Sequence, residues 1–260
     1  MSPKLFFGKV LKNAILLSII TIGLNNQVYS QIVNIEGKRI ITDKVGWAGF
    51  VDVGFNLQKT EKKLFNLTGL GHVQFKTAKD LFLLLTSFEF ITVNDGDLEN
   101  RSLAHFRYNR KLGSLVRWEV FAQQQFNKVK NIKNRLLFGI GPRFKLSGSK
   151  KLKTYFGLLY MYEIENLTDS DITGKYHRIS SYLSFSFSPS EKTSFVSTTY
   201  YQPNIENFSD YRVSSGNSFL VKLSRRISFI LNVGFEYDSM PAEGINKSSY
   251  AVSNSLRYTF

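Results

Sequence analysis

The chain has 260 residues, a formal net charge of +14 and no cysteine, which excludes disulfide bonds and thiolate metal sites. Its three histidines, His72, His105 and His177, lie far apart and form no metal-ligand spacing, so we expect no metal and no cofactor. Basic residues are dispersed along the chain, which argues against nucleic acid as a partner and favours a surface facing anionic lipid headgroups.

The amino-terminal part of the chain has the features of an export signal. Lys4, Lys9 and Lys12 precede the apolar run AILLSIITIGL, and no acidic residue occurs among the first thirty residues. The apolar run has the length of a signal-peptide h-region. The run is too short for an ordinary transmembrane helix. We predict a cleaved signal peptide over 1–30 and a short periplasmic segment over 31–44. Removing the three lysines would lower the net charge from +14 to +11.

The remainder of the chain alternates between apolar and polar residues with a period of two, which is typical of strands with one apolar face. Each run has about ten residues or more, the length that a tilted strand needs to cross a bilayer. About twelve runs are predicted, near 45–58, 63–75, 80–92, 100–110, 114–127, 133–146, 152–165, 176–188, 192–203, 210–223, 225–238 and 248–260. The ninth run has no clear apolar face, so its register stays open.

The connections between the runs alternate in length and in charge. Short ones such as RKLGS and SGSKK carry basic residues, whereas most longer ones, such as TVNDGDLEN and ENLTDSDITGK, carry acidic residues. Short periplasmic turns and longer outer loops are typical of bacterial outer-membrane barrels. We therefore predict an all-β fold, a transmembrane antiparallel β-barrel of about twelve strands over 45–260 in a Gram-negative outer membrane.

A soluble β-sandwich is the main alternative fold, but its strands would be shorter and its aromatic face would be hidden in a core. In lipid a sheet must close, because an unpaired edge leaves backbone groups unsatisfied, so the last strand should pair with the first. The last strand carries Tyr258 and Phe260 on its apolar face, where aromatic residues suit a membrane interface. These two residues also resemble the assembly signal read by the outer-membrane insertion machinery, which we expect as a partner together with outer-membrane lipid.

Two short elements on successive predicted strands carry a family resemblance. RWEVFAQQQFN and NRLLFGIGPRFKL, followed by YFGLLYMYE, contain a Glu-x-Phe-x-Gln element and an Arg-x-x-x-Gly-x-Gly element, formed by Glu119, Phe121, Gln123, Arg135, Gly139 and Gly141. With these elements the chain, from about residue 47 to 260, resembles the bacterial outer-membrane family called Domain of Unknown Function 481. The resemblance implies an outer-membrane location and supplies neither a substrate nor a catalytic site.

The predicted inward face carries many charges, which in a confined lumen must pair or stay hydrated. By strand parity, the inward charged residues are Asp52, Glu89, Arg107, Arg117, Glu119, Arg135, Arg143, Glu163, Arg178, Glu236 and Arg257. They are interpreted either as a structural ladder of Arg–carboxylate bridges or as a charged constriction that selects small solutes. A twelve-stranded barrel lies between filled eight-stranded barrels and wide sixteen-stranded porins, so a narrow pore is compatible with this size.

Two classes of function remain open from the sequence. One is a structural or narrow-pore barrel with small solutes as its ligands, and the other is a binding or assembly component that acts through its loops or periplasmic turns. A lipid-modifying enzyme is a weaker hypothesis, because it rests only on His177 near Ser180 and Ser181. Such an enzyme needs a nucleophile, a base and an orienting group close together, and no second motif supplies them. We therefore assign no catalytic residue.

Overall fold

The computed structural model describes residue 35 and residues 45–59, 63–93, 97–149, 151–170 and 172–260. The predicted signal peptide and the predicted periplasmic segment, apart from Ile35, lie outside these residues. Within the described part, one short 3-10 helix, η1 (Lys128–Lys130), accompanies twelve strands. These are β1 (Gly46–Lys59), β2 (Lys63–Lys76), β3 (Asp80–Val93), β4 (Asp97–Lys111), β5 (Val116–Asn127), β6 (Ile132–Gly148), β7 (Leu152–Leu167), β8 (Thr173–Phe187), β9 (Thr193–Pro203), β10 (Tyr211–Lys222), β11 (Ile227–Asp238) and β12 (Ser248–Thr259). No helix in these ranges is long and apolar enough to cross a membrane.

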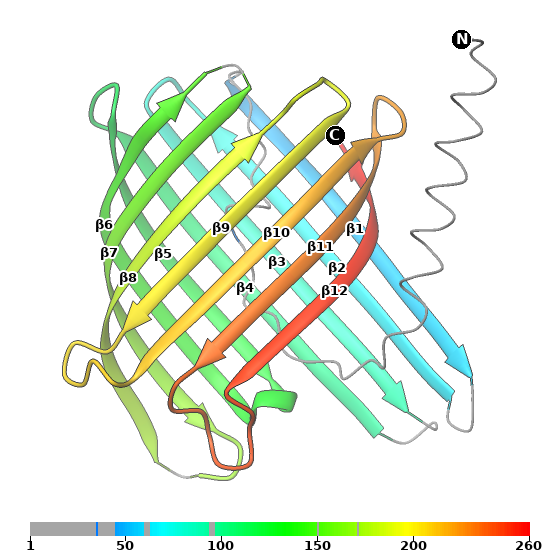
Figure 1. Cartoon of the computed structure of the whole chain (residues 1–260), viewed down its shortest axis with the longest axis vertical. Helices are drawn as coiled ribbons and strands as arrows, with labels where there is room; N and C mark the ends of the chain where they lie inside the picture. The colour runs from blue at the N-terminus through cyan, green and yellow to red at the C-terminus, as the bar shows by residue number, and fades with distance from the viewer. Residues whose placement is uncertain (1–34, 36–44, 60–62, 94–96, 150, 171) are drawn as a thin grey trace.

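The strands form one closed antiparallel barrel (Figure 1), in which each strand pairs with its neighbours in sequence and β1 pairs with β12. The predicted twelve-stranded barrel is therefore confirmed, and the predicted strand bounds are correct to within a few residues. Closure leaves no free sheet edge, which is the condition for a sheet in lipid.

The outer wall of the barrel is apolar and aromatic. Leu84, Phe106, Leu158 and Phe235 are each between 43% and 48% exposed, and they represent a much larger set on every part of the wall. A soluble protein rarely exposes such a continuous apolar surface, whereas a barrel that spans a membrane requires one. The fold is a transmembrane barrel.

The register of β9, which the sequence left open, is fixed by its neighbours. Thr198 and Tyr200 are buried in the lumen, whereas Thr199 and Tyr201 face outward. The hydroxyl of Thr199 donates a hydrogen bond to Ser215 on the adjacent strand β10, at 3.1 Å. Both faces of β9 carry hydroxyl groups, which explains why no apolar face could be recognised for this run.

The two ends of the barrel differ. At the turn rim, the connections are 77–79, 112–115, 149–151, 188–192 and 223–226, and the chain ends beside them (top of Figure 1). Thr77, Ser149, Ser190 and Ser224 each accept hydrogen bonds from backbone N–H groups two and three residues later. Such side-chain bonds stabilise tight turns. The opposite end, the loop rim, carries η1 and the loops over 204–210 and 239–247.

The seam between β1 and β12 closes close to the chain end. The Phe260 N–H donates to the Gly49 carbonyl at 3.1 Å, and the Gly49 N–H donates to the Phe260 carbonyl at 3.2 Å. The Phe260 ring covers Gly49 so closely that a Cβ atom at this position would overlap the ring. With the Phe260 ring in this place, position 49 has no room for a side chain.

Candidate functional site in the barrel lumen

The lumen contains two buried carboxylates that each form ion pairs with two or more arginines. The first is Glu119 on β5, whose side chain is fully buried. Arg107 of β4 approaches it at 3.1 Å, and Arg143 of β6 approaches it at 3.5 Å. The Tyr182 hydroxyl of β8 donates a hydrogen bond to the same carboxylate at 3.0 Å. Because β8 is not a neighbour of β5, this last bond crosses part of the lumen.

The second carboxylate, Glu163 on β7, binds three arginines. Arg178 of β8 donates to it at 2.8 Å, Arg135 of β6 lies at 3.1 Å, and Arg212 of β10 lies at 2.6 Å. The Glu163 side chain is fully buried. A single carboxylate cannot neutralise three cations, so further acids are required nearby.

Three more acids surround the Glu163 arginines. Glu165 pairs with Arg135 and lies 3.6 Å from Arg212. Asp238 accepts from Arg212 at 2.8 Å, and Asp210 accepts from Arg178 at 2.9 Å. Counting the three arginines against Glu163, Glu165, Asp210 and Asp238 gives a cluster with formal charge −1. The charges are thus nearly balanced, which is the condition for burying so many of them.

The loops at the loop rim also reach into this network. Asp210 ends the loop over 204–210, and Asn204 at the start of that loop donates to it at 3.1 Å. Lys130 of η1 forms an ion pair with Glu236 of β11. Since η1 lies between β5 and β6, this pair joins distant strands at the mouth of the barrel. At the loop rim, the Lys130–Glu236 pair therefore connects η1 with a strand that is not its neighbour in the barrel.

The remaining predicted residues lie outside these two clusters. Arg257 of β12 binds Asp52 of β1 through two nitrogens, at 2.7 and 2.8 Å, and so fastens the seam. Glu89 pairs with Arg101 at 3.0 Å. Arg117 stacks over the Tyr155 ring at 5.7 Å, and among the described residues it forms no ion pair with a carboxylate.

All eleven residues predicted for the lumen lie on the inward side of the wall, but the sequence reasoning missed several partners. Arg101, Glu165, Arg212 and Asp238 have the same inward parity as the residues that were chosen, so the same rule would have included them. Lys130 and Asp210 lie at connections, where strand parity gives no guidance. Only the folded chain brings these two residues to the network.

Two small cavities lie between the described side chains. A cavity of about 40 Å³ borders the first cluster and is lined by Ile35, Arg107, Glu119, Phe121, Tyr182, Gln202 and others. A second cavity of about 40 Å³ lies below the loop over 239–247, beside Lys130 and Glu236. Cavities of this size hold a few water molecules.

Comparison with known proteins places the chain in a family. The family model described as "Protein of unknown function, DUF481" matches residues 51–260. The chain belongs to the DUF481 family. The resemblance seen in the sequence is therefore confirmed. No curated protein matches the chain.

Several solved porin structures resemble this DUF481 member weakly. A structure described as NanC porin is 13% identical with a TM-score of 0.47, covering 81% of this chain and 97% of that one. KdgM porin in complex with disordered oligogalacturonate is 10% identical with a TM-score of 0.45, covering 81% and 99%. An anion-selective porin from Comamonas acidovorans is 10% identical with a TM-score of 0.41, covering 84% and 99%. Similarity at this level has no bearing on function.

The residues that carried the DUF481 resemblance have distinct physical roles. Glu119 holds the first cluster, and Gln123 contacts the His105 ring at 2.7 Å. The Phe121 ring covers Gly139, where a Cβ atom would overlap it. A Cβ atom at Gly141 would overlap the backbone of β7 instead. Each glycine thus permits a close approach that another residue would prevent.

The residues of the enzyme hypothesis are not assembled into a nucleophile and base. His177 faces outward, and its Nδ1 contacts the Tyr160 hydroxyl at 2.5 Å. The Ser181 hydroxyl donates to the Tyr201 carbonyl at 3.0 Å, and Ser180 is buried on the inward face. Among the described residues no group of three or more potential metal ligands occurs. The lumen network is the strongest candidate site.

Proposed function

We propose that this DUF481 member is an outer-membrane barrel with a narrow lumen, in which Arg–carboxylate links stiffen the wall and restrict passage to water and small ions. The observation that carries the proposal is the contact of Arg212 on β10 with Glu163 on β7, at 2.6 Å. These strands are separated by two others, so the link spans a chord of the lumen instead of running along its wall.

Two further features support a restricted lumen. The Tyr182–Glu119 bond and the Lys130–Glu236 pair also join elements that are not neighbours in the barrel. The cavity that Ile35, Arg107 and Glu119 line has a volume of about 40 Å³, enough for a few waters. The apolar outer wall and the short turns at one rim are typical of bacterial outer-membrane barrels, which supports the location.

Single-channel recording on the purified, refolded protein tests the proposal. We expect a low conductance for the wild-type protein, and a higher conductance with a shift towards cations for Arg212→Ala. The variant removes the Arg212–Glu163 link across the lumen and one positive charge, while Glu163 keeps its ion pairs with Arg135 and Arg178. Refolding of each variant is verified by the difference in gel migration between unheated and heated samples.

The control is Arg110→Ala, which removes the same charge from the turn rim. Arg110 pairs with Asp80 at 3.1 Å, and more than half of its side chain is exposed. We expect this variant to conduct like the wild-type protein. A widely open wild-type channel would contradict the proposal, as would an Arg212→Ala channel indistinguishable from the Arg110→Ala channel.

A further inference from the structure

One part of the lumen wall is apolar. Phe50 of β1, Leu70 of β2, Leu83 and Leu85 of β3 and Leu103 of β4 all point inward and together form a buried cluster, here called the apolar wall. Their exposed fractions lie between 0% and 7%. Inward leucines are unexpected in a water-filled barrel, whose interior is normally polar. Something must therefore cover them.

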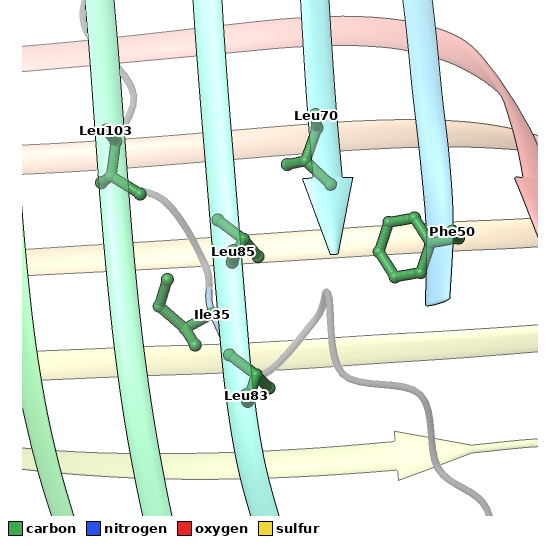
Figure 2. Packing of buried hydrophobic residues seen from close by; sticks show 6 residues of the cluster. All are labelled: Ile35, Phe50, Leu70, Leu83, Leu85 and Leu103. Carbon is green, nitrogen blue, oxygen red and sulfur yellow. The ribbon is translucent and has the colours of Figure 1, made fainter. Parts of the chain in front are cut away.

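Ile35 belongs to the same cluster, although it precedes the first strand. Its exposed fraction is 3%. Figure 2 shows Ile35 beside Leu83 and Leu85 of β3 and Leu103 of β4. A branched aliphatic side chain that is excluded from water gains from such contacts about as much as a core residue does.

Ile35 also borders the opposite side of the lumen. It lines the central cavity together with Arg107, Glu119, Phe121 and Tyr182. The residue thus lies between the apolar wall and the first charge cluster. On this side a second buried cluster, which includes Phe121, Leu137, Leu159 and Met161, extends the apolar lining from β5 to β9.

The chain is long enough for this placement. β1 begins at Gly46 near the turn rim, and eleven residue steps separate it from Ile35. Eleven extended residues span at most about 36–40 Å, which exceeds the half-thickness of a bilayer core. Ile35 therefore reaches the middle of the lumen without any displacement of β1.

We propose that Ile35 is an internal plug residue, which docks on the apolar wall and narrows the lumen at mid-depth by a hydrophobic constriction. Such constrictions oppose the passage of ions because a narrow apolar section holds little water. This inference deepens the proposed function, since it names a second barrier that acts with the charge network. The group that occupies the apolar wall is an isoleucine side chain of the chain itself.

The position of Ile35 is tested by cross-linking, because the protein has no cysteine of its own. The full chain carrying Ile35→Cys together with Leu85→Cys is refolded in detergent, its folding is verified by heat-dependent gel migration, and it is oxidised. We expect a disulfide, seen as a reductant-sensitive change in migration of the denatured protein and a mass loss of two hydrogens. Ile35→Cys with Leu83→Cys and Ile35→Cys with Leu103→Cys are parallel pairs, so that the test survives a misfolded variant.

The matched control pairs Ile35→Cys with Leu84→Cys. Leu84 neighbours Leu85 on the same strand but faces outward and is 48% exposed. We expect no intramolecular disulfide in this control. Equal cross-linking in the control, or none in all three inward pairs, would overturn the placement of Ile35.

The blocking role is tested by single-channel recording on Ile35→Asp, with Val45→Asp as the control. Val45 adjoins the barrel and is 67% exposed, so it adds the same charge outside the apolar wall. We expect a several-fold higher conductance for Ile35→Asp and no change for Val45→Asp. Unchanged conductance of Ile35→Asp would overturn the plug, while a higher conductance of Arg212→Ala would still support the proposed function.

Discussion

At the Glu163 carboxylate, three arginine side chains replace the water that an exposed carboxylate would bind. The ion pairs at 2.6, 2.8 and 3.1 Å supply the compensation that a fully buried charge requires. The value of such a cluster lies less in its net energy than in the penalty for breaking it. Removal of one partner leaves the others buried and uncompensated.

We therefore expect Glu163→Gln to destabilise the barrel by about 3–5 kcal/mol. The measurement is urea unfolding of the refolded protein in detergent, followed by tryptophan fluorescence. Arg117→Ala is the matched control in the lumen, because Arg117 contacts the Tyr155 ring and no carboxylate in the described part of the chain. It should cost less than Glu163→Gln by a clear margin. Similar losses for the two variants would show that the cluster has no special role in stability.

At the scale of single strands, a glycine permits the close approach of β6 to β7. Gly141 sits where any side chain would overlap the Leu158 carbonyl and the Leu159 Cα atom of β7. These are backbone atoms of a paired strand, so they cannot move aside as a flexible side chain does. A bulkier residue must therefore separate the two strands and weaken the ladder between them.

Gly141→Ala should consequently lower the yield of folded barrel or its stability, by about 1–3 kcal/mol as for other overpacked sites. Gly113→Ala is the control, because a Cβ atom there meets no atom within 4 Å and the φ angle is not positive. It should change stability by about 0.5 kcal/mol or less. Both variants are compared by unfolding and by heat-dependent gel migration. Equal stability of the two variants would refute the close-approach argument.

The same strands show what the sequence could predict. Alternation fixed the number of strands and which residues of β5, β6 and β7 face inward, because each has an apolar outer face in lipid. It did not fix β9, since Ser197 and Thr199 replace apolar residues on its outer face. Strand parity predicts which face of the wall a residue occupies, but not its depth along the barrel axis. The contact of Arg212 with Glu163 across the lumen could therefore not be predicted. Ile35 had no strand pattern at all.

At the scale of the whole molecule, closure joins the first strand to the last. The Asp52–Arg257 pair lies in the lumen, and the Phe260–Gly49 hydrogen bonds lie at the turn rim. Arg257 also lies over the Phe50 ring at 3.5 Å, so the seam connects to the apolar wall. The seam therefore joins the charged and the apolar parts of the lumen wall to the end of the chain.

We propose that Phe260, together with Tyr258, also addresses the barrel for insertion, and Phe260→Ala separates this role from closure. In the refolded protein the variant loses an aromatic side chain that is 63% exposed, so the cost should be about 1–3 kcal/mol or less. In cells, failed recognition by the insertion machinery should remove most of the protein from the outer membrane. The measurements are unfolding in detergent and immunoblots of outer-membrane fractions.

Phe229→Ala is the matched control for this last experiment. Phe229 lies on the outward face of the adjacent strand β11, opposite Leu256 of β12, and is 38% exposed. The Phe229→Ala variant therefore loses a similar lipid contact near the same rim but keeps Tyr258 and Phe260, the proposed insertion signal. We expect Phe229→Ala to reach the membrane at nearly wild-type levels. If both variants reach the membrane equally well, Phe260 is an interfacial anchor only, and if Phe260→Ala loses stability in detergent as severely as abundance in cells, its role lies in closing the seam.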